Sequence, residues 1–295
     1  MSKQPVAPSA IPLGKGLERA FATPRALTEA EISEIIERFA HSATLVKQAG
    51  FSGVQIHGAH GYLVSHFLSP RHNQRTDKWG GSAENRMRFV LEVYRAMRQS
   101  VGEDFPIGIK LNSADFMKEG FTEDESMAVV EALSNEGINL IEVSGGTYES
   151  PEMMSDDRKE STRKREAYFI EYADKARAVC QATLVVTGGF RSGAGMANAL
   201  QSGSTDMIGL ARPLAVYPDL PNRILEDPHY KIAIKRPSTG IKAIDFMAML
   251  DITWYELQLR RLARGQRAKV NLGAWEATVN TLLSTGYHAF QQRRA

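Results

Sequence analysis

Cysteine is nearly absent from this chain, with Cys180 the single one among 295 residues. A disulfide framework, a cysteine-built zinc site and an iron–sulfur site each need several sulfurs, so one thiol excludes all three. A reducing compartment, and therefore a cytoplasmic location, is expected. The N-terminal sequence MSKQPVAPSAIPLGKG has no apolar stretch of signal-peptide length, which supports the same expectation.

Long hydrophobic runs and an excess of one charge are also lacking. No apolar stretch reaches the roughly 20 residues that span a membrane, and 36 Lys and Arg residues nearly balance 34 Asp and Glu residues. Neither a basic stripe nor an acidic tail suggests nucleic acid or a membrane as a partner. With 43% hydrophobic residues, the chain is expected to bury a sizeable core and to bind a small molecule.

What the sequence does contain is a repeated order of helix, glycine and strand. From Thr28 onward, apolar residues recur at helical spacing, with Thr28 and Glu31 as a capping box and Gly50 as a stop before the short run VQIH. The same order returns with helices expected over about 82–100, 122–137, 166–181 and 193–203. The pattern predicts five strands, near residues 54–57, 107–111, 140–144, 183–187 and 206–210.

Strands that alternate with helices imply βαβ crossovers and a parallel sheet. A doubly wound open sheet and a (β/α)8 barrel both fit this order. No G-x-G-x-x-G turn follows any strand, and the last two strands end in glycine-bearing segments where barrels commonly hold a phosphate. The sequence therefore predicts an α/β fold of the TIM (β/α)8 type that is short by three strands.

The regions on either side of the repeats are expected to lie outside the βα pattern. Residues 1–27 contain four prolines and form an extended segment without predicted strands, and residues 28–236 form the partial barrel. Residues 237–295 form a helical extension that packs on the barrel. Its two helical patterns cover about 241–264 and 272–291. The charged loop 148–166 is expected to be solvated or to lie over the barrel mouth.

The stretch VQIHGAHGYL places His57, His60 and Tyr62 at the end of the first predicted strand. Chemistry in barrels of this kind collects at the carboxyl ends of the strands. Two neutral imidazoles can each donate one N–H to a single oxygen, and a nearby phenol can deliver a proton. A metal site would need His66 or His72 as a third ligand and lacks a cysteine or H-E-x-x-H framework. Structural histidines with satisfied hydrogen bonds are the remaining alternative.

Two further features concern an anion and a cation. Gly188 and Gly189 in VVTGGF leave backbone N–H groups open to an anion, and Arg212 in GLARP adds a fork of donors after the next strand. Together they predict a phosphate site at the barrel mouth. Lys110 in IGIKLN lies on the opposite face from its apolar neighbours, either in a structural ion pair or as a cation aimed at a ligand.

The sequence resembles the Old Yellow Enzyme family of flavin-dependent ene-reductases. The resemblance rests on GFSGVQIHGAHGYLVSHFLSPRHNQRTDKWGGSAENRMRF, with TGGF and LARPLAVYPDLP as further support, and runs from about Pro5 to the C-terminus. It implies a (β/α)8 barrel that holds FMN non-covalently. NADH or NADPH would reduce the bound FMN. It also implies that the family's first three strands are missing here. The exposed sheet edges would then favour aggregation or a homo-oligomer.

The resemblance implies a catalytic role for three residues. His57 and His60 would hydrogen-bond the carbonyl or nitro oxygen of an α,β-unsaturated substrate, and Tyr62 would protonate its α-carbon. Hydride would pass from the flavin to the β-carbon of the substrate. No metal is expected.

Four residues would contact the cofactor. Lys110 would take the place of the basic residue, usually arginine, beside the N1/O2 edge of the flavin, and Gly188, Gly189 and Arg212 would bind the FMN phosphate. Two other functions stay open at this point. One is a barrel aldolase or isomerase on a phosphorylated substrate, with Lys110 as Schiff base or general base. The other is a catalytically inactive, truncated remnant.

Overall fold

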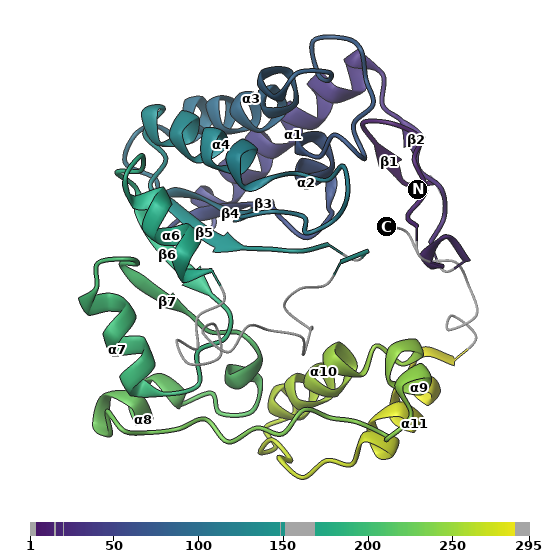
Figure 1. Ribbon diagram of the computed structural model, residues 1–295, viewed down its shortest axis with the longest axis vertical. Coiled ribbons are helices and arrows are strands. Elements are labelled where there is room, and N and C mark those ends of the chain that lie inside the picture. Colours follow the sequence, from purple (N-terminus) through teal and green to yellow (C-terminus); the bar gives the residue numbers. More distant parts are fainter. Residues whose placement is uncertain (1–3, 15, 20, 148, 151–168, 287–295) are drawn as a thin grey trace.

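The computed structural model describes residues 4–286 except 15, 20, 148 and 151–168. Its centre is a parallel sheet of five strands, which pair in the order in which they occur along the chain (Figure 1). The strands are β3 (Val54–Gly58), β4 (Ile107–Asn112), β5 (Leu140–Ser144), β6 (Thr183–Thr187) and β7 (Met207–Gly209). All five predicted strands are confirmed to within one residue at each end.

Helices connect the strands along one side of the sheet, here called the outer face. Capping boxes begin two of them: Thr28 and Glu31, as predicted, satisfy each other's backbone N–H groups, and Thr122 and Glu125 do the same at the start of α4. Among the described helices, none is long and apolar enough to cross a membrane. The helices of this layer are α1 (Glu29–Gln48), α2 (Leu63–Leu68), α3 (Ala83–Val101), α4 (Glu123–Asn135), α6 (Ile170–Arg177) and α7 (Gly193–Gln201).

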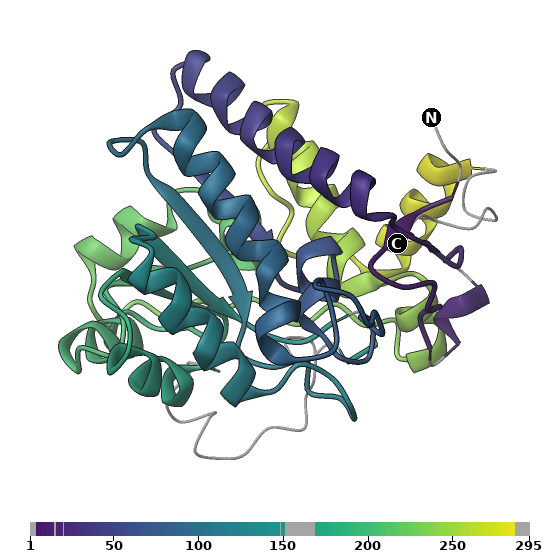
Figure 2. The same ribbon diagram turned by 90° about the horizontal axis from the view of Figure 1, so that it is seen from above.

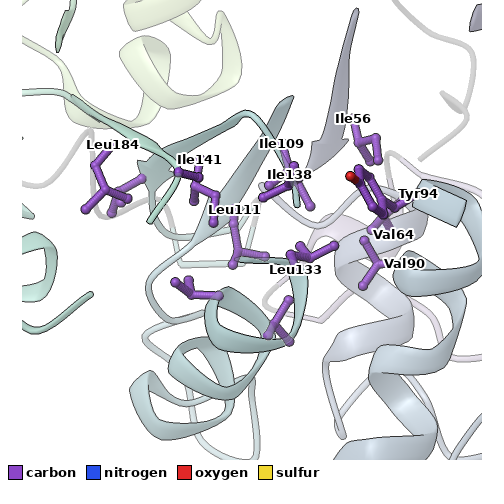
Figure 3. Packing of buried hydrophobic residues seen from close by; sticks show 14 of the residues in the cluster. Ile56, Val64, Val90, Tyr94, Ile109, Leu111, Leu133, Ile138, Ile141 and Leu184 are labelled. Atoms are coloured by element: carbon purple, nitrogen blue, oxygen red, sulfur yellow. The ribbon is translucent and has the colours of Figure 1, made fainter. Parts of the chain in front are cut away.

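The core lies between the outer face of the sheet and this helix layer. One register row of the sheet is aliphatic and fully buried, and it lines up beside Tyr94 and Leu133 of the helices (Figure 3). Burying one such side chain is worth about 1.5–3 kcal/mol, so this row fixes which residues face outward. The row consists of Ile56, Ile109, Ile141 and Leu184. The adjacent residues therefore lie on the opposite side, here called the inner face.

The N-terminal segment differs from the prediction that it contains no strand. Val6–Ala7 (β1) and Arg25–Ala26 (β2) pair in parallel, with a 3-10 helix at Leu17–Arg19 (η1) between them. Strands of two residues have no alternation to detect in a sequence, which is why the prediction was wrong. The guanidinium of Arg75 donates to the carbonyl of Leu27 at 2.6 Å and so ties this segment to the loop between α2 and α3.

The C-terminal region also differs from its prediction in one respect. The single helical pattern over 241–264 forms two helices, α9 (Lys242–Met247) and α10 (Leu250–Ala263), because Met249 adopts a left-handed φ of 47° between them. Such a φ is uncommon for a residue with a side chain and interrupts the helix.

Helix α10 packs against α11 (Ala274–Thr285). The C-terminal helices lie apart from the helices of the outer face in Figure 1, and in the view from above they are partly behind α1 (Figure 2). Trp254 of α10 is buried and donates its indole N–H to the carbonyl of Leu272 at 2.9 Å. The same small cluster includes Val216, which follows the 3-10 helix η3 (Arg212–Ala215) and precedes α8 (Leu220–Glu226). The C-terminal helices thus contact the segment after β7. The division at residue 237 stays a prediction.

Candidate active site

The carboxyl end of β3 carries the predicted histidine pair. His57 alternates with the buried outer row and lies on the inner face. The chain then turns sharply, with His60 at φ 63° and Gly61 at φ 76°. A left-handed conformation in a residue other than glycine costs of order 1–3 kcal/mol and is concentrated at functional sites. The ring centroids of His57 and His60 lie 5.3 Å apart, and those of His57 and Tyr62 lie 4.9 Å apart.

His60 is held by the ends of the next two strands. Its Nε2 lies 2.7 Å from the Ser144 hydroxyl at the end of β5, and its backbone N–H donates to the side-chain oxygen of Asn112 at 3.2 Å. Asn112 in turn donates to Asp115 and to the carbonyl of Gly146. The ring of His60 is thus fixed by a hydroxyl and not by a carboxylate that would favour imidazolium.

Both imidazoles are kept neutral by their surroundings. Burial is the main cause that lowers the pKa of His57, the Lys110 ammonium lowers it further, and Glu142 opposes them. Burial lowers the pKa of His60 to about 4, with His57 and Lys110 acting in the same direction and Glu142 against it. A neutral imidazole retains one N–H donor. At pH 7 each neutral ring can therefore offer one N–H to a ligand, and in His60 this is Nδ1–H when Nε2 accepts from the Ser144 hydroxyl.

The inner face continues from His57 into the neighbouring strands. The register pairs His57 with Lys110 and Lys110 with Glu142. The Lys110 ammonium donates to Glu142 Oε1 at 2.6 Å, and the same carboxylate accepts from Thr187 at 2.5 Å and from Gln55 at 3.0 Å. The ion pair that was one alternative for Lys110 is therefore present. Its side chain keeps 22% exposure, so it also faces the space above the inner face.

The predicted phosphate residues follow the last two strands. Gly188 and Gly189 have φ values of 111° and 96°, which side chains rarely adopt, directly after β6. Strand β7 pairs with β6, and Arg212 follows it at the first residue of η3. Parallel strands place these groups at the same edge of the sheet as His57. Strand β6 is three strands from β3, so a ligand that reaches both must bridge about 14 Å at about 4.8 Å per strand.

Two charged residues near the candidate site were not predicted from the sequence. Glu142 in NLIEVSGG is a charged residue within an apolar strand, the same signal that drew attention to Lys110. Arg191 directly follows TGGF, and its charge lies near Tyr255: burial raises the pKa of that phenol, and both Arg212 and Arg191 oppose the rise. Positive charge therefore gathers beyond β6 and β7, where an anion was expected.

The histidines that a metal site would need lie in a different group. His66 and His72 stack with ring centroids 4.3 Å apart, and His72 Nε2 lies 2.8 Å from Glu149 Oε2. Glu149 also accepts from Arg71 at 3.0 Å and from the backbone N–H of Gly14 at 2.8 Å. Across the described ranges, no group of three or more His, Cys, Asp or Glu side chains is arranged to hold a metal ion.

Glu149 belongs to the loop 148–166, which was expected to be solvated or to lie over the mouth. Its side chain is 1% exposed and connects the loop to the N-terminal segment. Of this loop, only residues 149 and 150 lie within the described residues. The expectation of a solvated side chain is therefore wrong for Glu149. Its buried charge is stabilised by hydrogen bonds from three donors in distant segments.

We expect Glu149→Gln to destabilise the fold in an acid-sensitive way. Burial alone raises the pKa of Glu149, but donors from His72, Arg71 and Gly14 outweigh it and lower the pKa to about 2. The stabilisation is present above the ordinary pKa of about 4.5 and is lost as pH falls toward about 2. At about 1.4 kcal/mol per pKa unit, it amounts to about 3 kcal/mol.

Urea unfolding of both proteins at pH 7 and at pH 3 measures this contribution. The wild-type advantage should be largest at pH 7 and shrink at pH 3, whereas Glu131→Gln on the exposed side of α4 should change stability at neither pH. Equal stability of wild type and Glu149→Gln at pH 7 would show that the carboxylate does not anchor the loop.

Comparison with known proteins decides the family. The family model of the NADH:flavin oxidoreductase / NADH oxidase family matches residues 2–229. The chain belongs to this family. One relative is the NADH-dependent flavin oxidoreductase nadA of Aspergillus parasiticus, 41% identical over 224 residues that cover 75% of this chain and 50% of the relative. The chain spans about half the length of the curated relatives it matches.

Solved structures agree with the family assignment. A 2-naphthoyl-CoA reductase in complex with 2-naphthoyl-CoA aligns with a TM-score of 0.68 and 31% identity, covering 76% of this chain and 33% of that chain. An old yellow enzyme homologue from Zymomonas mobilis aligns with a TM-score of 0.62 and 27% identity, covering 78% and 64%. The Old Yellow Enzyme resemblance and the α/β fold of (β/α)8 type are confirmed. The five described strands form an open part of such a barrel. In this family, FMN is the cofactor and a nicotinamide nucleotide is the reductant.

Proposed function

We propose that this chain acts in an FMN-dependent reduction of the activated C=C bond of α,β-unsaturated carbonyl or nitro compounds, with NADH or NADPH as the reductant. The observation that carries the proposal is the pair of neutral imidazoles of His57 and His60, 5.3 Å apart at the carboxyl end of β3. A related solved structure holds 2-naphthoyl-CoA, whose ring is conjugated to a thioester carbonyl. A carbonyl oxygen is a group that two neighbouring N–H donors would bind.

The residues present fit FMN at both ends of the molecule. The positive φ values of Gly188 and Gly189 and the charge of Arg212 suit the phosphate group. The ammonium of Lys110, on the inner face beside His57, suits the electron-rich edge of the flavin ring. When bound, FMN would supply the hydride that adds to the β-carbon of the substrate.

The protein's own part is to bind the substrate oxygen and to deliver a proton. His57 and His60 each donate one N–H to the oxygen, where negative charge develops during reduction, and such donors are typically worth about 3 kcal/mol each. The phenol of Tyr62 is 39% exposed and lies beside the ring of His57. From there it can donate its O–H proton to the α-carbon.

An aldolase or isomerase role for Lys110 is less well supported. Its amine is engaged by Glu142 at 2.6 Å, so a nucleophilic amine would first have to leave an ion pair. The family match also names flavin chemistry and no aldol reaction. An inactive remnant would bind no flavin, which the next experiment decides.

The proposal is tested by anaerobic spectroscopy of the purified chain after mixing with FMN and desalting. We expect the protein to stay yellow, to bleach when NADH or NADPH is added, and to regain colour when cyclohexenone is added. Cyclohexanone, which has no activated double bond, should not restore the colour. Colourless protein after desalting would contradict the proposal. Bleached protein that cyclohexenone does not reoxidise would contradict the substrate class.

A further inference from the structure

One carboxylate on the inner face has no role in the reaction described above. Glu142 lies in the middle of β5, between the fully buried Ile141 and Val143, and its side chain is only 14% exposed. A charged group in such a position costs free energy unless it is paired and hydrogen-bonded. Its partners therefore indicate why it is there.

Donors from three other strands converge on Glu142. Oε1 accepts from Lys110 of β4 and from Thr187 of β6, and Oε2 accepts from Gln55 of β3. His57, Lys110 and Glu142 lie side by side on three neighbouring strands, and the carboxylate of Glu142 holds the Lys110 ammonium on the side away from His57. A lysine has a flexible four-carbon stem, so a fixed partner is needed to define where its charge lies.

We propose that Glu142 is a positioning residue for the flavin: it holds the Lys110 ammonium in the row of His57 and partly cancels its charge, and so sets the field at the N1/O2 edge of a bound flavin. This inference rests on the proposed function, because it needs Lys110 at that edge. The Lys110–Glu142 distance of 2.6 Å and the shared register row carry it.

The electrostatics of His57 point the same way. Burial lowers the pKa of His57, Lys110 lowers it further and Glu142 raises it, so the two charges act on the imidazole in opposite directions. Without Glu142, the charge of Lys110 would act uncompensated on His57 and on the flavin. Reduction adds negative charge at the flavin edge, and an uncompensated cation there favours the reduced form.

The first test uses the full chain without FMN. In Glu142→Gln, we expect an amine-reactive reagent to modify Lys110 roughly tenfold faster, since a hydrogen bond to a charged group is lost. The NMR titration of His57 should move to lower pH. Glu142→Asp keeps the charge but shortens the reach, so Lys110 should react faster while His57 titrates near the wild-type value. Glu136→Gln, which removes a partner of Arg95 at the end of α4, should change neither.

The second test uses the same proteins with FMN. The midpoint potential of the bound flavin should rise in Glu142→Gln and fall in Lys110→Met, relative to wild type. Unchanged Lys110 reactivity and His57 titration in both Glu142 variants would overturn the positioning role. Changes in Lys110 reactivity and His57 titration without a shift in the flavin midpoint potential would overturn the effect of Glu142 on the flavin. Failure of wild type to retain FMN would contradict the proposed function, and the measurements without FMN would still decide whether Glu142 holds Lys110.

Discussion

The double variant His57→Ala, His60→Ala is expected to lose roughly 10,000-fold in kcat/KM for an enone, because each donor to a developing oxyanion typically contributes about a hundredfold. The loss should appear mainly in kcat, since the donors act most strongly when negative charge builds up on the oxygen. Each single variant should lose about a hundredfold. Steady-state kinetics with cyclohexenone and NADPH measure all three proteins.

Two controls separate this effect from a loss of structure. FMN retention after desalting should be the same in the double variant as in wild type, because the phosphate residues lie at the ends of β6 and β7. His41→Ala, on the exposed side of α1, should leave kcat/KM unchanged. A loss of less than tenfold in the double variant would rule out the histidine pair as the oxyanion donors.

Arg212→Ala is expected to weaken FMN binding by roughly a hundredfold, which is the loss of a charge-assisted, bidentate contact to a phosphate. Riboflavin has the same ring without the phosphate, so its affinity should be equal in wild type and variant. Fluorescence titration with both ligands measures the two dissociation constants. Arg38→Ala, an exposed arginine of α1 that pairs with Glu34, is the matched control and should bind FMN like wild type.

The comparison of the two ligands decides what Arg212 does. Selective weakening of FMN would assign the guanidinium to the phosphate. Equal weakening of FMN and riboflavin would instead mean that Arg212 supports the fold around the site, and the phosphate site predicted from Gly188 and Gly189 would need another cation. Arg191, whose charge also acts on Tyr255, would then be the next residue to replace.

Local signals in the sequence were sufficient for the repeated part of the fold. Capping boxes at Thr28 and Thr122 and short β-branched runs between glycines located helices and strands because these features act over a few residues. The pairing of β1 with β2 and the break at Met249 were not predictable in this way. The pairing joins residues that are far apart in the chain, such as Val6 and Arg25, which no short window of the sequence contains. No local sequence signal marks Met249 as left-handed.

The candidate site was predictable to a similar degree. His57, His60 and Tyr62 lie within six residues, and the structure brings their rings together as expected. Glu142 is marked in the sequence only as a charge within an apolar strand, and its pairing with Lys110 depends on the register between β4 and β5. Strand register is a long-range property, and composition alone does not reveal it. The burial of Glu149 was missed for the same reason, since its donors come from residues far away in the chain.

One bound flavin is proposed to lie between the histidine pair and the phosphate residues. A crystal structure of this chain with FMN and an unreactive enone analogue would show both contacts at once. We expect the phosphate against Gly188, Gly189 and Arg212, and the ligand oxygen within hydrogen-bond distance of both His57 and His60. A flavin bound elsewhere, or a ligand oxygen that contacts neither imidazole, would contradict this proposal.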